Sequence, residues 1–416
     1  MRHAPTPVQL ILLMCAAEVL SMVGAVTFPA LLPTFIDIWH LSKTDAGWIN
    51  GIYYAGYLAA VPVLVSLTDR MPPRRIYLFC LVLSALASLG FATVTDGFWT
   101  AMLFRALGGI GLAGSYMPGL KLLTDHLEHA RPGHDNSRAV AFYTSSFGIG
   151  TSLSFFMAGE IAVQWDWQTA FAVTVAGPLL GAFLSVALLP RKDPRPHQAP
   201  STHLLDFRPV LRCRAAMGYV LAYTVHNFEL FAYRSWLVAF LVFAVATHPG
   251  QGMLLSATAW AAIANLLGLP SSVLGNELSR RIGRHRAITI IQWTSAALAC
   301  GLGFAAEAPF GVVIALIMIY GWTITGESSS VTAGVVAAAP EGYRGATMAV
   351  HSSIGFIGSF AGPLLFGVAL DLTSITGAGG ESTSSWGWAF AFSGAVVALG
   401  PIALAVLRDK QETGKT

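Results

Sequence analysis

Six ionisable side chains lie inside long apolar stretches of this sequence, where an unpaired charge is costly. They are Glu18, Arg105, His226, Glu229, Arg234 and Glu327. A charged group at the centre of a bilayer costs about 2.5–3.5 kcal/mol on insertion scales, so these groups need partners or a wet cavity. A guanidinium group binds a carboxylate or phosphate through two parallel hydrogen bonds, and a buried glutamic acid can exchange a proton. The residue types therefore predict a buried site for an anionic group and a proton.

The seventh apolar stretch holds three of the six. At 100° per helical residue, His226, Glu229 and Arg234 cover an arc of about 140° centred on His226. This arc can face one cavity, but Glu229 and Arg234 lie too far apart to pair well with each other. We expect their partners on other helices, Arg105 and Glu18 among them, or on a bound substrate. Two alternatives remain open: static ion pairs that brace helices, and a gate or helix-end role for Glu327.

Aromatic and amide side chains extend the predicted site. In the second apolar stretch, Asn50, Tyr54 and Tyr57 share one helix face because they are four and three residues apart. Further candidates for lining the cavity are Trp260, Asn265, Tyr320 and Trp322. Tyrosine and tryptophan are also common where a helix crosses the membrane surface, so an interfacial role is the alternative for the aromatic residues.

The elements that position these residues are predicted from hydropathy. Of the 416 residues, 55% are hydrophobic and 11% are charged, whereas a soluble domain has roughly 25% charged residues. Apolar runs of about 20 residues, enough to cross a hydrocarbon core, recur along the chain. They cover residues 9–32, 46–67, 76–95, 98–121, 138–162, 168–189, 215–244, 252–274, 287–306, 309–332, 346–370 and 386–407. The sequence therefore predicts an all-α polytopic membrane protein with twelve transmembrane helices.

Basic residues predict the orientation of these spans. All but three of the 24 lysines and arginines lie at the termini or in the loops on one face, the exceptions being Lys43, Arg105 and Arg234. The positive-inside rule then places both termini in the cytoplasm, and we expect the plasma (inner) membrane. The net charge of +3 reflects this topology, so we do not expect nucleic acid as a partner. The first run is too long for a cleavable signal and is predicted to stay as a helix.

The chain shows signs of an internal duplication. A basic segment at 69–75 follows the second span, and another at 279–286 follows the eighth. Between the halves, residues 190–211 form a basic, proline-containing stretch typical of an extended linker. We therefore predict a six-helix bundle at 1–189, a cytoplasmic linker at 190–211 and a second six-helix bundle at 212–416.

These segments resemble a loop motif of the major facilitator superfamily, which reads roughly G-x-L-A-D-R-x-G-R-R. In the first copy Leu67, Asp69, Arg70 and Arg74 match, whereas Val65 and Pro72 replace the two glycines. In the second copy Leu278, Arg281, Gly283 and Arg284 match, and Arg280 stands where the acid would be. The resemblance implies two pseudo-symmetric six-helix bundles around a central cavity. It also implies a cytoplasmic gate that involves Asp69, Arg70, Arg74, Arg281, Gly283 and Arg284.

The resemblance and the buried charges together favour secondary transport by alternating access. We expect a small organic anion or zwitterion as substrate, moved by a proton-coupled symporter in which Glu229 and His226 carry the proton. One alternative is efflux of lipophilic cations or neutral drugs by proton antiport, with Glu18 and Glu327 as the acids. The fifth span lacks the proline typical of drug antiporters, and this absence disfavours the antiport alternative. A non-transporting sensor on the same scaffold is the third possibility.

Enzymatic chemistry finds little support in the sequence. No phosphate-binding loop, nucleophile elbow or helical His/Glu metal motif is present. The four cysteines, Cys15, Cys80, Cys213 and Cys300, lack metal-binding spacing. We therefore expect no enzyme activity, no cofactor and no bound metal. The expected partners are the lipid bilayer, a small-molecule substrate and a proton, and the family resemblance suggests a monomer.

Overall fold

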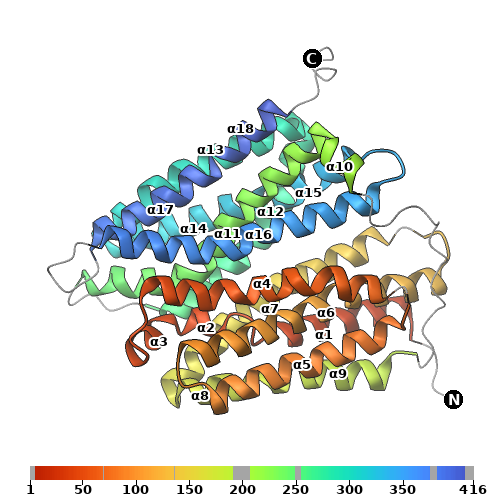
Figure 1. Ribbon diagram of the computed structural model, residues 1–416, viewed down its shortest axis with the longest axis horizontal. Helices are drawn as coiled ribbons and strands as arrows, with labels where there is room; N and C mark the ends of the chain where they lie inside the picture. The colour runs from red at the N-terminus through yellow and green to blue at the C-terminus, as the bar shows by residue number, and fades with distance from the viewer. Residues whose placement is uncertain are drawn as a thin grey trace. The chain divides into compact units, whose positions relative to one another are not determined.

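The computed structural model describes residues 5–68, 70–134, 136–190, 207–248, 254–374 and 382–407. Every regular element in these ranges is helical, as predicted (Figure 1). The first half of the chain forms α1 (Pro7–Met22), α2 (Thr27–Ala30), α3 (Leu32–Ile38), α4 (Lys43–Leu67), α5 (Pro73–Val94), α6 (Phe98–Ala130), α7 (Ser137–Gln164), α8 (Trp167–Thr174) and α9 (Ala176–Leu188). The second half forms α10 (Arg208–Arg212), α11 (Arg214–Ala246), α12 (Ala257–Ile282), α13 (Arg284–Leu302), the 3₁₀ helix η1 (Gly303–Ala305), α14 (Phe310–Gly326), α15 (Ser328–Ala337), α16 (Arg344–Thr373), α17 (Thr383–Val397) and α18 (Leu399–Val406).

All twelve predicted spans fall on these helices. Within the described residues, ten helical segments are long and apolar enough to cross a membrane. The other two predicted spans are α1, an apolar helix of 16 residues, and α6, which has 33 residues but includes Arg105 and Lys121. The prediction of an all-α polytopic membrane protein is confirmed.

Four of the spans are interrupted. The first breaks between α1 and α2, and the tenth breaks at Glu327, between α14 and α15. The sixth and twelfth break at equivalent places, and in each a proline, Pro178 or Pro401, is the third residue after the break. Proline has no N–H to donate to the preceding turn, which explains both interruptions. The Gly-Pro pair that follows both breaks, Gly177-Pro178 and Gly400-Pro401, is a further sign of duplication.

The chain divides into two compact units, which we describe separately. The first comprises Met1–Leu31, Ile52–Ala199 and Ala261–Leu266. The second comprises Leu32–Gly51, Pro200–Trp260 and Leu267–Thr416. The start of α4 thus belongs to the same unit as α11 and α16, although it precedes them by more than 160 residues in the chain. The predicted domain boundaries at residues 189 and 212 stay a prediction.

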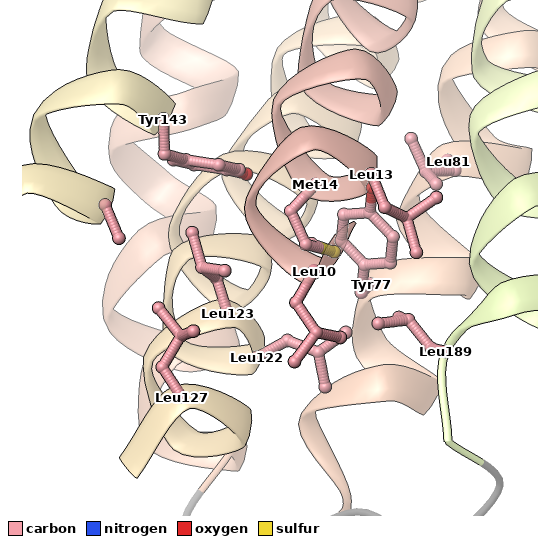
Figure 2. Close-up of a cluster of buried hydrophobic side chains, with 11 residues drawn as sticks. Leu10, Leu13, Met14, Tyr77, Leu81, Leu122, Leu123, Leu127, Tyr143 and Leu189 are labelled. Atoms are coloured by element: carbon pink, nitrogen blue, oxygen red, sulfur yellow. The ribbon is translucent and has the colours of Figure 1, made fainter. Parts of the chain in front are cut away.

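A hydrophobic cluster holds one end of the first unit together. Leu10, Leu13 and Met14 of α1 are buried among side chains of α5, α6 and α7, as Figure 2 shows. The other members are Tyr77, Leu81, Leu122, Leu123, Leu127, Ala139, Tyr143 and Leu189. Moving a large side chain of this kind out of water contributes about 1.5–3 kcal/mol of stability. Inside a bilayer, the close packing of the side chains is itself the source of attraction between helices.

Glycines bring α4 and α6 into backbone contact in the first unit. A side-chain carbon at Gly109 would overlap the carbonyl group of Tyr53, and one at Gly56 would overlap the carbonyl oxygen of Ala106. Small residues permit such close approach of membrane helices. Gly109 therefore serves the packing of α4 against α6.

We predict that Gly109→Ala destabilises the protein, because the added methyl group must push α4 and α6 apart. The cost should be about 1–3 kcal/mol, as for other overpacked interiors, measured as a lower thermal midpoint in detergent. Gly301→Ala in α13 is the matched control, since nothing lies within 4 Å of its added carbon. Equal midpoints for both variants and the wild type would contradict the close-packing role.

Candidate functional site

A buried contact between a histidine and a carboxyl group joins α11 to the break between α14 and α15 in the second unit. Nδ1 of His226 lies 3.2 Å from Oε1 of Glu327, and the two side chains are only 1% and 2% exposed. Glu327 occupies the single residue between the two helices. The sequence placed both residues in one site but did not predict that they would pair.

Gln292 of α13 connects this pair to a third helix. Its Nε2 atom donates to Oε1 of Glu327 at 2.9 Å and to the carbonyl oxygen of Ala222 at 3.1 Å. One amide group therefore binds both the carboxyl group and the backbone of α11, one turn before His226. Gln292 is 1% exposed, so these bonds form away from water, where hydrogen bonds are strongest.

Glu229 lies one turn after His226 on α11 and bonds to α13. The Ser295 hydroxyl donates to Oε1 of Glu229 at 2.8 Å, and Tyr320 of α14 is a further hydrogen-bonding neighbour. The carboxyl groups of Glu229 and Glu327 are close enough to interact electrostatically. Both are buried to 1% exposure, and His226 can offset only one negative charge. Such a cluster favours states in which a proton neutralises one carboxyl group.

Glu18 forms a separate buried site in the first unit. The hydroxyl of Tyr143 in α7 donates to Oε2 of Glu18 at 3.0 Å, and the Ser21 hydroxyl lies 3.4 Å from the same atom. Glu18 is fully buried. The hydroxyl groups of Tyr143 and Ser21 are neutral, so this carboxyl group has a different environment from Glu327.

The two buried arginines contact aromatic rings. Arg105 of α6 is 4% exposed, donates to the carbonyl oxygen of Ala25 at 3.1 Å and lies 4.2 Å from the centre of the Tyr53 ring. Ala25 belongs to the break between α1 and α2, so Arg105 supports backbone that has left the helix. Arg234 of α11 is 8% exposed and lies 5.6 Å from the ring centre of Phe231.

The remaining cavity candidates differ in burial. Tyr54, Tyr57 and Tyr320 are buried, with 4%, 2% and 1% exposure. The amides of Asn50 and Asn265 donate to carbonyl groups one turn earlier in their own helices, those of Ala46 and Ala261. Trp260 is half-buried, whereas Trp322 is 36% exposed. A common cavity for these residues stays a prediction.

In the first copy of the loop motif, Arg74 caps a helix. Its guanidinium group donates to the carbonyl oxygens of Pro190 at 2.7 Å, Ser185 at 3.0 Å and Val186 at 3.2 Å. These carbonyls end α9, where the helix dipole is negative, so a positive charge is stabilising. Arg70 is exposed, and Asp69 lies outside the described residues. The gate itself stays a prediction.

In the second copy, one arginine contacts its own helix and another reaches a neighbouring helix. Arg281 is 3.2 Å from Glu277, one turn earlier, and Arg284 donates to the carbonyl oxygen of Ala333 in α15 at 3.3 Å. Gly283 joins α12 to α13 with a φ of +91°, a left-handed conformation that favours glycine. The motif glycine is therefore required by the backbone at this turn.

Sequence reasoning missed the neutral partners of the buried charges. These are Tyr53, Tyr143, Gln292 and Ser295. Only Gln292 carried a usable signal, because an amide in the middle of an apolar span must find a hydrogen-bonding partner.

Comparison with known proteins identifies the family. The family model described as Major Facilitator Superfamily matches residues 13–363 and 246–416. The chain belongs to this superfamily. Among solved structures, the nucleoside transporter NupG is similar with a TM-score of 0.77 at 14% identity, covering 96% of this chain and 98% of that one. The D-xylose-proton symporter has a TM-score of 0.75 at 15% identity, with 98% and 99% covered.

A curated relative in the superfamily is Protein spinster of Drosophila melanogaster. It is 24% identical over 308 residues, which cover 71% of this chain and 48% of that protein. The first curated relatives are matched over about a third to a half of their own length. The structural likenesses, all under 25% identity, establish the superfamily fold.

We predict that Arg74→Gln destabilises the first unit by about 1–2 kcal/mol, because the end of α9 loses its charged hydrogen-bond donor. Thermal unfolding in detergent measures the change. Arg75→Gln is the matched control, since its side chain is exposed and the charge change is the same. An equal loss in the control would show that overall charge, rather than the cap on α9, is responsible.

Proposed function

We propose that this protein is a secondary transporter that moves a small solute across the membrane by alternating access. Membership of the superfamily supports this function, as does the likeness to the nucleoside transporter NupG and the D-xylose-proton symporter. The buried ionisable groups supply the binding chemistry that transport needs. We further propose a monomer in the plasma membrane with both termini in the cytoplasm, as the distribution of basic residues predicts.

The coupling ion in this proposal is a proton. The observation that carries it is the cluster of His226, Glu327 and Glu229, with Gln292 and Ser295 holding the two carboxyl groups in place. A proton gained or lost by Glu327 changes the electrostatic attraction across its 3.2 Å contact with His226, which lies between α11 and the α14–α15 break. Protonation at this point can therefore change how these helices pack. Glu229 offers a second acceptor one turn away.

The substrate is a small organic anion or zwitterion. Buried Arg105 and Arg234 support this choice, because a guanidinium group in a low-dielectric setting attracts a carboxylate or phosphate strongly. The alternative is efflux of a lipophilic cation by proton antiport. The observation in its favour is that Oε2 of Glu229 and of Glu327 has no hydrogen-bond partner within the described chain.

Proton movement in liposomes tests the coupling. Purified protein is reconstituted with an internal pH dye, and pools of anions, cations and neutral solutes are added in turn. We expect pH shifts with the anion pool, which Glu229→Gln and Glu327→Gln reduce to the level of protein-free liposomes. Glu160→Gln in α7, outside the cluster, is the matched control and should retain the shifts. Solute movement without any pH shift would exclude proton coupling, and shifts confined to the cation pool would favour antiport.

The anion assignment has its own test at Arg234. We predict that Arg234→Ala lowers uptake of the active anion by more than about tenfold, because a charged hydrogen-bonding partner worth about 1.5–3 kcal/mol is removed. Arg234→Lys keeps the charge but loses the forked geometry, so it should recover only part of the activity. Arg212→Ala, at an exposed position of α10, is the control at equal expression. Unchanged uptake by Arg234→Ala would exclude a role for this residue in anion binding.

A further inference from the structure

The first turn of α4 is capped partly by its own residues. The hydroxyl of Ser42 accepts from the backbone N–H of Asp45 at 3.0 Å. The carboxylate of Asp45 in turn accepts from the Ser42 backbone N–H at 3.2 Å and from its hydroxyl at 2.7 Å. The first two N–H groups of the helix, those of Lys43 and Thr44, are not part of this reciprocal box.

The carboxylate of Asp371, near the end of α16, completes the cap of α4. Oδ1 of Asp371 in α16 accepts from the Lys43 N–H at 3.1 Å, and Oδ2 accepts from the Thr44 N–H at 2.8 Å. Oδ2 also accepts from the Thr44 hydroxyl at 2.6 Å. The three bonds join residues more than 320 positions apart, and the negative charge meets the positive end of the α4 dipole.

Next to this contact, the backbones of α4 and α16 approach each other closely at three glycines. A carbon added at Gly47 would lie 2.7 Å from the Pro363 carbonyl oxygen, and one at Gly51 would lie 2.7 Å from that of Phe360. A carbon added at Gly367 would overlap the carbonyl group of Lys43. Glycines on both helices therefore allow the close approach that lets Asp371 reach the end of α4. All of these residues belong to the second unit.

We propose that Asp371 is a latch that holds the start of α4 against the end of α16, so that the first turns of α4 open only when its three hydrogen bonds break. The positive-inside assignment places this end of the molecule outside the cell. These three hydrogen bonds can break reversibly, because the N–H groups of α4 and the Asp371 carboxylate lie at helix ends, where water can solvate them. This inference goes beyond the proposed transport function and does not depend on the identity of the substrate or ion.

Hydrogen exchange of the whole protein in detergent or nanodiscs, read by mass spectrometry, tests the latch. In Asp371→Asn, an amide N–H₂ replaces one acceptor oxygen and the charge is lost. We expect exchange in the first two turns of α4 to become about tenfold faster, as for loss of a charged hydrogen bond. Peptides from α13, which does not contribute to the contact, should keep their wild-type rates. Asp37→Asn, an exposed acid in α3, is the matched control and should change nothing.

Two further variants separate the latch from general loss of structure. Thr44→Val removes one of the three bonds and should give a smaller increase in the same peptides. Gly47→Ala keeps Asp371 but forces the helices apart, so it should speed exchange at the start of α4 by a different route. Unchanged exchange in Asp371→Asn, or an equal rise in α13, would overturn the proposal. Neither result would bear on proton coupling, because no substrate or pH gradient is used.

Discussion

The scarcity of hydrogen-bonding solvent inside the membrane is the constraint on which this structure depends. A polar group that leaves water must be satisfied by the chain itself, or it destabilises the fold by several kcal/mol. Glu18 is satisfied by Tyr143 of α7, and Glu229 by Ser295 of α13. Each of these bonds joins two helices that are distant in sequence. The buried polar residues therefore help to decide which helices become neighbours, in addition to forming the candidate site.

The same constraint explains why charged groups gather at the ends and breaks of helices. A helix end leaves N–H or C=O groups without partners. Arg105 binds the carbonyl of Ala25 at the break in the first span, and Arg74 binds the carbonyls that end α9. Asp371 binds the N–H groups that begin α4. In all three cases the sign of the charge matches the exposed end of the peptide dipoles.

Hydropathy was enough to predict the twelve spans, because a bilayer demands long apolar runs whatever the tertiary contacts are. The charged members of the site were also visible, since Glu18 or Glu327 stands out in an apolar stretch. Their partners were not, because Ser295 and Tyr143 are ordinary residues in membrane helices and only the packing shows what they touch. Asp371 was missed for a related reason. An acid at the end of a span suggests an interfacial residue, and its bonds to Lys43 and Thr44 depend on folding across most of the chain.

The two buried carboxyl sites differ in a way that bears on proton exchange. Glu18 bonds to hydroxyl groups, so ionising it creates a negative charge that these two neutral partners do not offset. Glu327 lies 3.2 Å from Nδ1 of His226, and a proton that moves between these two groups interconverts an ion pair and a neutral pair without changing the net charge. The cost of burying an isolated charge is therefore avoided in both states. Gln292 can donate to Oε1 of Glu327 in either state, which keeps the carboxyl group in place while the proton moves.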